Sequence, residues 1–333
     1  MTAEPATRVM LADAGAILQA ARTLNADGLV AFPTETVYGL GADATNPKAI
    51  ARLYAAKGRP AFNPLIAHVS SLAAAKVLAV FDAAGEKLAE TFWPGPLTLV
   101  LRKQPDCPVA ELATAGLDTI AVRVPNHPVA RDILHALGRP IVAPSANRSG
   151  HVSPTTAAHV AADLAGRIDL IIDGGATPVG VESTIVACLG EPALLRPGGV
   201  PRAAIERALG KRLSNTQISP ADDEAPLAPG MLASHYAPRT RIRLDVGHIE
   251  PGEALLAFGA SLPEGAQRSK KTLNLSARGD LIEAAANLFS HLRALDASGA
   301  AGIAVMKVPH EGLGEAINDR LVRAAAPRQG KMQ

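Results

Sequence analysis

The stretch AFPTETVYGLGAD, residues 31–43, continues an apolar strand into small polar residues and two glycines. We expect the strand to stop at Pro33 and the following residues to form a loop at its end. Loops of this kind bring the backbone close to a ligand, because Gly39 and Gly41 carry no Cβ that would hold it away. Since α/β folds gather their ligands at strand ends, the stretch predicts a binding site in an α/β domain.

A dinucleotide site is the first interpretation to test, because GLGADA at 39–44 fits the pattern G-x-G-x-x-A. That fingerprint also needs an acidic residue about 20 positions later, which binds the ribose. After Asp43 the next acidic residue is Asp82. The basic residues between them are Lys48, Arg52, Lys57, Arg59 and Lys76. Basic side chains suit phosphate better than ribose hydroxyls, so the sequence disfavours NAD binding.

The composition predicts a globular protein with room for two domains, because 48% of the 333 residues are hydrophobic and 19% are charged. A net charge of +2 and 3% aromatic residues argue against a large nucleic-acid surface. Cys107 and Cys188 form no C-x-x-C motif, which disfavours a zinc site and favours a reducing cytoplasm. The first ten residues lack the apolar core of a signal peptide, and we expect no membrane span.

Helix and strand patterns alternate irregularly along the first 200 residues. Residues 46–58 have the signals of a helix, with Asn46 as N-cap, Pro47 in the first turn and Gly58 as the stop. We expect further helices at 13–28, 71–81, 127–137 and 155–165. Short apolar runs predict strands at 29–32, 64–69, 97–102, 119–124, 140–145, 168–173 and 183–188. This mixture predicts an open twisted mixed sheet, in a domain of residues 12–200.

Residues 201–240 differ in character, because much of this segment is polar, rich in proline and poorly periodic. We interpret it as a linker. Strand patterns at 241–246, 254–259, 272–276 and 302–308 follow, with helices near 280–296 and 313–325. They predict a smaller Rossmann-like α/β domain over residues 241–330.

Two basic positions stand out as candidate ligand groups. In KGRPAFNPL, residues 57–65, Lys57 and Arg59 form a plausible phosphate clamp, although cations at a helix end also complement the helix dipole. Arg123 lies within the apolar strand TIAVRV, where a charge must be paired or face a site. A carboxylate ligand would be its natural partner. His68, in another apolar strand, is more simply read as a satisfied polar contact.

Polar residues also gather at other strand ends. Ser145 and Asn147 lie in APSANRSG, residues 143–150, and Ser153 begins a helix, whose N-terminus attracts anions. Glu-Ser-Thr at 182–184 opens a strand, and Arg196 ends another before Pro-Gly-Gly. Each of these stretches alone is compatible with an ordinary turn. No Walker loop, nucleophile elbow, H-E-x-x-H motif or identifiable pair of catalytic acids occurs.

Taken in order, these stretches resemble the YrdC-type threonylcarbamoyl-adenylate synthases of tRNA modification. The resemblance rests on PTETVYGLG, KGRPAFNPL, WPGPLTLVL, AVRVPNHP, APSANRSG, VESTIV and LLRPG. GMLASHYAP, followed by a small domain, resembles the longer two-domain form of that family. The resemblance covers about residues 12–330 and implies an open twisted α/β sheet with a large, positively lined cavity.

The resemblance also implies a reaction, in which L-threonine, bicarbonate and ATP give L-threonylcarbamoyl-adenylate and pyrophosphate. Threonine contacts are implied for Thr36, His68, Arg123, the backbone at Ala143, and Ser183. ATP contacts are implied for Arg59, Asn63, Thr119, Ser145, Ser153, Arg196 and Tyr236. Lys57 would add a cation, so that Lys57 and Arg59 would stabilise the leaving pyrophosphate. Tyr236 would belong to a lid that excludes water from the adenylate.

The expected cofactor is Mg²⁺, held mainly by the phosphates of ATP. The expected partner is a separate transferase complex that passes the threonylcarbamoyl group to tRNA, and a transient tRNA contact is compatible with the sequence. One alternative is an RNA-binding module of the same fold without catalysis. Another is the YrdC-like part of hydrogenase-maturation carbamoyltransferases. Those proteins carry acylphosphatase and zinc-finger segments, for which this chain has neither cysteine pairs nor room.

Overall fold

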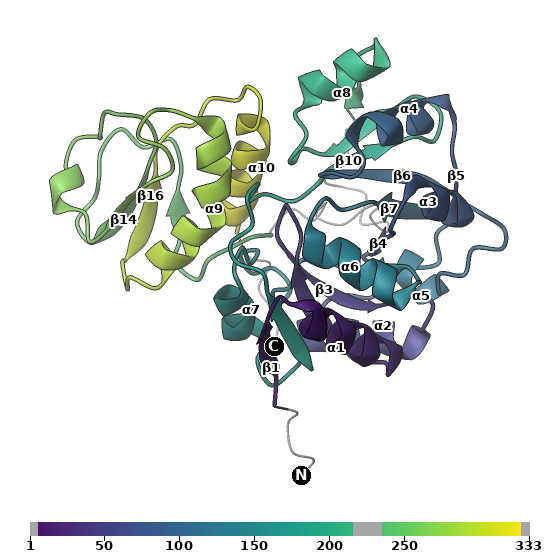
Figure 1. The fold of residues 1–333 in the computed structure, drawn as a ribbon. Helices are drawn as coiled ribbons and strands as arrows, with labels where there is room; N and C mark the ends of the chain where they lie inside the picture. Colours follow the sequence, from purple (N-terminus) through teal and green to yellow (C-terminus); the bar gives the residue numbers. More distant parts are fainter. Residues whose placement is uncertain (1–5, 216–234, 328–333) are drawn as a thin grey trace.

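A computed structural model describes residues 6–215 and 235–327 of the chain. The described chain forms a large α/β domain and a smaller one beside it (Figure 1). Within the expected linker, residues 201–240, the segment 216–234 lies outside the described residues.

The large domain is built on a mixed sheet, as the sequence predicted. Parallel pairs such as β4 with β7 alternate with antiparallel pairs such as β6 with β7. β5 (Ala79–Val80) pairs with β6 outside the main strand order. In spatial order the strands are β1 (Arg8–Leu11), β9 (Leu170–Asp173), β2 (Val30–Pro33), β3 (Tyr38–Asp43), β8 (Ile141–Val142), β4 (Ile66–His68), β7 (Thr119–Arg123), β6 (Leu97–Lys103), β10 (Thr184–Ala187), β11 (Ala193–Arg196) and β12 (Ser214–Asn215).

Helices cover both faces of this sheet. The alternation along β2 divides the core, because Val30 and Phe32 pack under α1 (Ala14–Asn25) and α6 (Pro128–Leu137) while Ala31 faces the other side. The second face carries α2 (Pro47–Lys57), α3 (Leu72–Leu78), α4 (Ala83–Phe92), α5 (Glu111–Thr114), α7 (Ala157–Leu164) and α8 (Arg202–Leu209). Because helices cover both faces of the sheet, polar side chains that bind a ligand can come together at the ends of the strands.

The first and last residues of α2 are as the sequence predicted. The Asn46 side chain accepts hydrogen bonds from the backbone of Lys48 and Ala49, and Pro47 begins the helix. Gly58 ends it in the left-handed region, with a φ of 59°. This ending fixes where the following loop, which carries Arg59, leaves the helix.

The expectation of a loop over residues 34–43 is partly wrong, since Tyr38–Asp43 is strand β3. It pairs antiparallel with β2 and β8, so Gly39 and Gly41 lie within the sheet. A Cβ on Gly41 would lie 2.6 Å from the Phe32 ring, and one on Gly39 would lie 3.1 Å from the Cβ of Ala143. The two glycines therefore permit close packing across the strand.

Several elements lie outside the sequence predictions. β1 precedes residue 12, and both α8 and β12 follow residue 200, yet β1 and β12 pair within the large sheet. Helix α4, between α3 and β6, was not predicted either.

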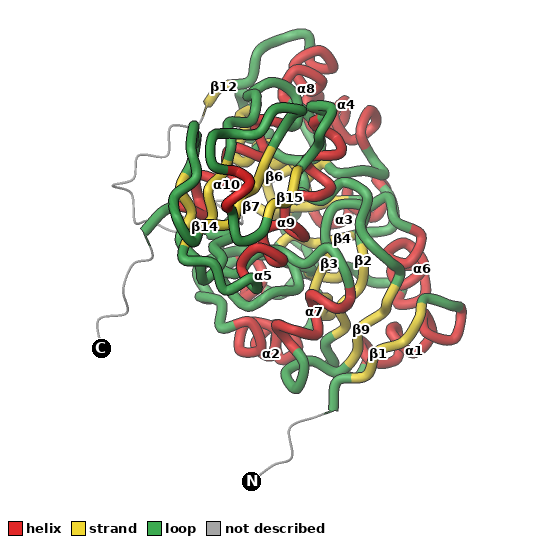
Figure 2. Tube along the Cα trace, turned by 90° about the vertical axis from the view of Figure 1, so that its left-hand side faces the viewer, coloured by secondary structure: helices red, strands yellow, loops and turns green. Residues whose placement is uncertain are grey.

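The small domain has a parallel sheet, in agreement with Rossmann-like layering. Its strand order is β13 (Ile242–Arg243), β16 (Gly302–Val305), β14 (Glu253–Ala257) and β15 (Thr272–Asn274). The 3-10 helix η1 (Ala266–Arg268) precedes β15, and helices α9 (Leu281–Asp296) and α10 (Gly314–Ala325) pack on the sheet. Figure 2 views the molecule from the side of this small domain. Among the helices within the described ranges, none has the length and apolar character that crossing a bilayer needs.

The two domains share an apolar core. Helices α9 and α10 lie between the small sheet and the large domain (Figure 1). Val37, Val152 and Val181 of the large domain join the cluster formed by the side chains of α9 and α10. Tyr236, near the end of the expected linker, is buried in the same cluster. The second domain is therefore packed directly against loops at strand ends of the first.

Candidate active site

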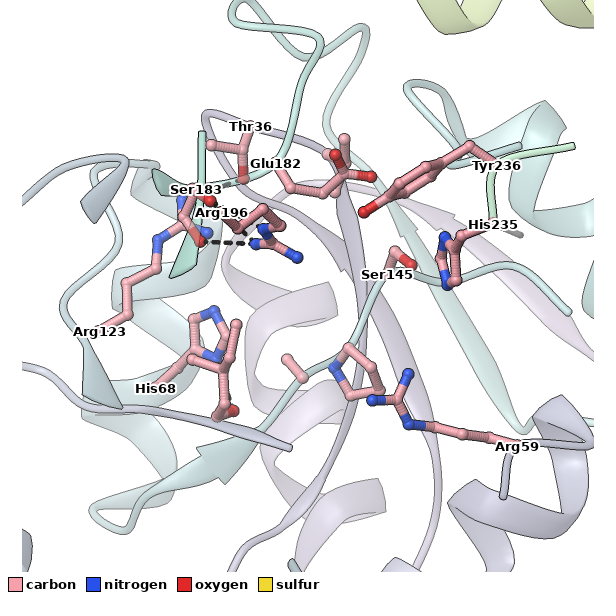
Figure 3. A pocket seen from close by; sticks show the side chains of 14 residues that line it. Thr36, Arg59, His68, Arg123, Ser145, Glu182, Ser183, Arg196, His235 and Tyr236 are labelled. Carbon is pink, nitrogen blue, oxygen red and sulfur yellow. Dashed lines mark hydrogen bonds between the residues drawn. The ribbon is translucent and has the colours of Figure 1, made fainter. Parts of the chain in front are cut away.

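A pocket lies where the ends of β2, β4, β7 and β11 meet the loops before β10 and after β8 (Figure 3). Nine side chains or backbone positions expected at the site line it. They are Thr36, Arg59, His68, Arg123, Ala143, Ser145, Ser183, Arg196 and Tyr236. These residues come from distant parts of the sequence, so the fold brings together most of the set that the resemblance implied.

Arg123 is held in a fixed orientation at one end of the pocket. Its Nη2 donates to Glu35 Oε1 at 2.7 Å and to Thr36 Oγ1 at 3.0 Å, and its Nε donates to the carbonyl of Gly95 at 3.3 Å. Within the described residues no acceptor is recorded for Nη1. The charge in the apolar strand is therefore paired inside the protein, and one edge of the guanidinium remains for a ligand.

His68 lies beside Arg123 on β4 and is 2% exposed. Burial, reinforced by the positive charge of Arg123, lowers the pKa of His68 to about 3. Its Nδ1 lies 3.2 Å from the carbonyl oxygen of Ile66. At neutral pH this imidazole is uncharged, so it offers a hydrogen bond without adding a cation.

Arg196 and Ser183 form the middle of the pocket. Arg196 Nη2 donates to the carbonyl oxygen of Ser183 at 2.9 Å and to its Oγ at 3.2 Å, while Ser183 Oγ also lies 2.7 Å from Thr98 Oγ1. Gly198 allows this arrangement, because a Cβ there would lie 2.3 Å from the carbonyl oxygen of Glu182. The Pro-Gly-Gly loop therefore packs against the backbone that carries Ser183.

Arg59 approaches from the opposite end, where Figure 3 also places Ser145. Its Nη2 donates to the carbonyl of Pro64 at 3.0 Å and its Nε to that of Asn63 at 3.3 Å. Burial lowers the pKa of Arg59 to about 10, with Arg196 adding to the effect, and the group stays charged at neutral pH. The stiff loop after α2 therefore presents a cation to the pocket.

Lys57 does not line the pocket. Its side chain is buried, and Nζ donates to the carbonyl of Ser145 at 2.5 Å and to that of Asn147. Burial, with the nearby charge of Arg59, holds the pKa of this amine well below its usual range. Lys57 thus holds the loop of residues 143–150, and the catalytic role that the resemblance implied for it stays a prediction.

Asn63, Thr119 and Ser153, expected at the ATP site, also do not line the pocket. Asn63 is buried, its backbone carbonyl accepts from Arg59, and its Oδ1 has no hydrogen-bond partner among the described residues. Thr119 begins β7, and Ser153 is fully buried and donates to the Glu182 carboxylate. The assignment of these three residues to ATP stays a prediction.

Two polar residues of the pocket were missed as site residues, although both lie in stretches that the sequence singled out. His235 is buried next to Tyr236, with ring centroids 4.1 Å apart. Glu182 is 5% exposed and is the one carboxylate among the described lining residues. The described lining contains three arginines, Arg59, Arg123 and Arg196, and one carboxylate. The pocket is therefore positively lined and suits anions.

Tyr236 adopts an uncommon backbone conformation, with a φ of 61°. Its ring stacks on Phe289 at a centroid distance of 5.7 Å, and the Arg320 guanidinium lies 5.0 Å from its centroid. Together with His235 it occupies one side of the pocket (Figure 3). The pocket is partly open to the surface, and the space in it that water can occupy is about 40 Å³.

No group of three or more His, Cys, Asp or Glu side chains that could hold a metal ion occurs within residues 6–215 and 235–327. The Glu182 carboxylate already accepts hydrogen bonds from Ser153 and Arg320. The expectation of a Mg²⁺ ion held mainly by the phosphates of ATP stays a prediction.

Family profiles match almost the whole chain. The Sua5/YciO/YrdC profile, described as "Telomere recombination", matches residues 22–198. The Sua5 C-terminal profile, described as "Threonylcarbamoyl-AMP synthase, C-terminal domain", matches residues 200–326.

Curated proteins and a solved structure agree with these profiles. Threonylcarbamoyl-AMP synthase of Bacillus subtilis is 42% identical over 327 residues, covering 94% of this chain and 93% of its own. The Pyrococcus abyssi enzyme of the same name is 43% identical over 318 residues, covering 90% of this chain and 91% of its own. The crystal structure of P. abyssi Sua5 complexed with L-threonine superimposes with a TM-score of 0.87 at 39% identity. It covers 96% of this chain and 98% of that one.

Proposed function

This chain belongs to the Sua5/YrdC family of threonylcarbamoyl-AMP synthases, in its two-domain form, and we propose that its pocket makes L-threonylcarbamoyl-adenylate from L-threonine, bicarbonate and ATP. One observation carries the assignment to this pocket. Arg59, Arg123 and Arg196 converge from three separate segments on one pocket. The substrates bring a carboxylate, a bicarbonate and a triphosphate, which are the anions that such a space favours.

The end of the pocket near Arg123 is proposed to bind L-threonine. The guanidinium edge that carries Nη1 is available for a carboxylate, while Glu35 and Thr36 hold the other edge. The neutral His68 imidazole and the Ser183 hydroxyl can each donate a hydrogen bond to, or accept one from, the amine and hydroxyl of the substrate. The relative from P. abyssi that binds L-threonine supports this choice of substrate.

The end near Arg59 is proposed to bind ATP. Arg59 and Arg196 would neutralise the phosphates, and Ser145 lies close by on a loop that Lys57 fixes. Tyr236 and His235 would cover the nucleotide and exclude water from the product.

The chemistry then depends mainly on positioning and charge neutralisation. The neutral amine of threonine attacks the bicarbonate carbon, and water leaves as the carbamate forms. A carbamate oxygen attacks the α-phosphorus of ATP, and pyrophosphate departs toward Arg59 and Arg196. Mg²⁺ held by the phosphates would supply further neutralisation when bound. In the described residues only Glu182 offers a carboxylate at the pocket, so we propose no protein cage for this ion.

We further propose that the product passes to a separate transferase, which attaches the threonylcarbamoyl group to tRNA. A mixed acid anhydride of a carbamate and AMP hydrolyses readily, so it must be consumed soon after release. A transient contact with tRNA would shorten that interval.

The test is pyrophosphate release from ATP and bicarbonate, measured with L-threonine, with L-serine and with neither. Release that requires L-threonine, together with a product of the mass of threonylcarbamoyl-AMP, would establish the activity. An RNA-binding module of this fold would instead bind tRNA tightly and release no pyrophosphate. Comparable release with serine would contradict the substrate assignment.

A further inference from the structure

A residue of the small domain reaches the wall of the pocket. Arg320, on α10, is fully buried, and its Nε donates to Glu182 Oε2 at 2.8 Å. Its guanidinium also lies 5.0 Å from the centre of the Tyr236 ring. Glu182 and Tyr236 both line the pocket, one from the large domain and one from the end of the linker. A single side chain therefore joins three parts of the chain.

We propose that Arg320 is a positioning residue for the nucleotide end of the site, so that the docked small domain completes the pocket by holding Glu182 and Tyr236 in place. The inference rests on the proposed function and adds a role for the second domain within the site. Arg320 does not line the pocket itself, so it acts through its two neighbours.

The first neighbour, Glu182, depends on Arg320 for its charge. Burial opposes ionisation of its carboxyl, but the charges of Arg320 and Arg196 and hydrogen bonds from Ser153 and Arg320 outweigh burial, so its pKa lies below its usual range. One carboxylate oxygen accepts from Arg320 and the other from Ser153. Without Arg320, the carboxylate would be buried with one oxygen unpaired, and the Ser153 hydroxyl would lose a fixed partner.

The second neighbour, Tyr236, needs support because its backbone conformation is uncommon for a bulky residue. Its ring lies near two side chains of the small domain, with Arg320 over the ring and Phe289 stacked on it at an interplanar angle of 25°. Both contacts would be lost together if α9 and α10 moved away. The small domain therefore supplies two of the contacts that hold the ring over the pocket.

The docking contact is close enough to transmit such a movement. Gly180 begins the loop that carries Glu182, and a Cβ at Gly180 would lie 2.3 Å from the carbonyl oxygen of Ala285 on α9. Arg293 of α9 donates to the carbonyl of Val152 and, at 2.8 Å, to Asp163 of the large domain. Backbone of the small domain thus touches the pocket loop directly.

An ion pair between domains can also be merely structural, and the chain offers a matched control. Arg202 on α8 pairs with Glu315 on α10 at 2.6 Å, with side chains 27% and 30% exposed. This pair joins the same helix α10 to the large domain, but neither residue lines the pocket. Loss of the Glu315 charge tests the docking of α10 without touching Glu182 or Tyr236.

The experiment compares wild type, Arg320→Met, Arg320→Lys, Glu182→Gln/Arg320→Met and Glu315→Gln. The double variant removes the buried Glu182–Arg320 pair and leaves Asp319, which pairs with both Arg320 and Arg323, with the partner Arg323, so it can fold even where Arg320→Met alone cannot. We expect the KM for ATP to rise about tenfold or more in the double variant, while the KM for L-threonine changes less than about threefold. Arg320→Lys keeps the charge but not the planar group over Tyr236, and should recover part of the loss. Glu315→Gln should retain the wild-type KM for ATP.

Two results would overturn the inference. One is a folded double variant with the wild-type KM for ATP, and the other is an equal loss in Glu315→Gln. ATP binding without threonine, followed by calorimetry, gives a readout that does not require turnover and should weaken in parallel. If wild type releases no pyrophosphate with threonine, the proposed function fails instead, and a calorimetric difference between the variants would still test the role of Arg320.

Discussion

Glu35 and Arg123 form an ion pair of 2.7 Å inside the large domain, where their side chains are 8% and 4% exposed. The carboxylate also accepts a hydrogen bond from the backbone nitrogen of Asn126 at 3.0 Å. The sequence predicted that this charge is either paired or faces a site, and the structure shows that it is paired. Glu35 sets the direction of the guanidinium, and the substrate would use only the edge that remains.

Loss of this guanidinium should impair the use of threonine more than the use of ATP. Because removal of Arg123 alone leaves Glu35 unpaired, the variant to test is Glu35→Gln/Arg123→Gln. A hydrogen bond to a charged group contributes about 1.5–3 kcal/mol, so the KM for threonine should rise at least about tenfold. Steady-state kinetics with each substrate varied would measure it.

The Asp43–Arg139 pair provides the control for that experiment. Its atoms lie 2.8 Å apart, Arg139 is 41% exposed, and neither residue lines the pocket. Asp43→Asn/Arg139→Gln should leave both KM values unchanged. Equal increases for threonine and ATP in the Glu35/Arg123 variant would contradict the assignment of Arg123.

Acid should destabilise the protein through His68. Burial and the charge of Arg123 lower the pKa of His68 from the ordinary 6.5 to about 3 on folding. Between these two pH values the unfolded chain therefore binds a proton at His68 that the folded chain does not bind. The stability is therefore complete above pH 6.5 and is lost as the pH falls toward 3, with a slope of about 1.4 kcal/mol per pH unit at most. His68→Asn should show a shallower pH dependence of the urea midpoint between pH 6.5 and 4. The same slope in both proteins would show that His68 titrates normally.

Truncation of Tyr236 should increase the amount of ATP that is consumed for each threonylcarbamoyl-AMP that accumulates. In Tyr236→Ala the ring that covers the pocket is absent, so water can reach the adenylate. We expect the ratio of pyrophosphate released to threonylcarbamoyl-AMP accumulated to rise several-fold, because tyrosine to alanine removes the contacts with Phe289 and Arg320. The two products can be measured in one quenched reaction. If the ratio stays at the wild-type value, Tyr236 does not exclude water.

Substitution of Gly180 should separate the domains. Gly180 and Gly175 both have a positive φ, 77° and 83°, so alanine strains the backbone at either position. Only at Gly180 would the new Cβ meet backbone of α9, at 2.3 Å, whereas nothing lies within 4 Å of one at Gly175. Gly175→Ala should therefore lower stability by about 1 kcal/mol.

Gly180→Ala should lower stability by considerably more than Gly175→Ala and should also expose the interface. Urea midpoints measure the first effect, and the rate of limited proteolysis between the domains measures the second. Equal midpoints and equal proteolysis for the two variants would mean that the domains are not held by this contact.

The sequence predicted best where a local signal decides the structure. Asn46, Pro47 and Gly58 mark the ends of α2, and the structure confirms each. Strand β3 was missed because Gly39 and Gly41 have low strand propensity, and only their neighbours Phe32 and Ala143 explain them. The packing that favours glycine there involves residues that are distant in sequence.

The candidate site shows the same limit. Arg123 was predictable because a charge in an apolar strand needs a partner, but the identity of that partner, Glu35, was not. Arg320 gave no signal, since an arginine on an amphipathic helix ordinarily faces solvent. Its role depends on Glu182, which is 138 positions away in the sequence. Such pairs follow from how the domains dock, which no local pattern encodes.

The strand order has a consequence for synthesis on the ribosome. β1 pairs with β9, and Arg8 lies opposite Leu170. This edge of the sheet can therefore form only after Leu170 has left the ribosome. Contacts that join such distant segments form late and slowly. Arg59, Arg123 and Arg196 can meet once the nascent chain has passed β11, whereas Tyr236 and Arg320 arrive afterwards. A growing chain should therefore fold its substrate pocket before it can seal it, and only the finished polypeptide would retain the reactive adenylate.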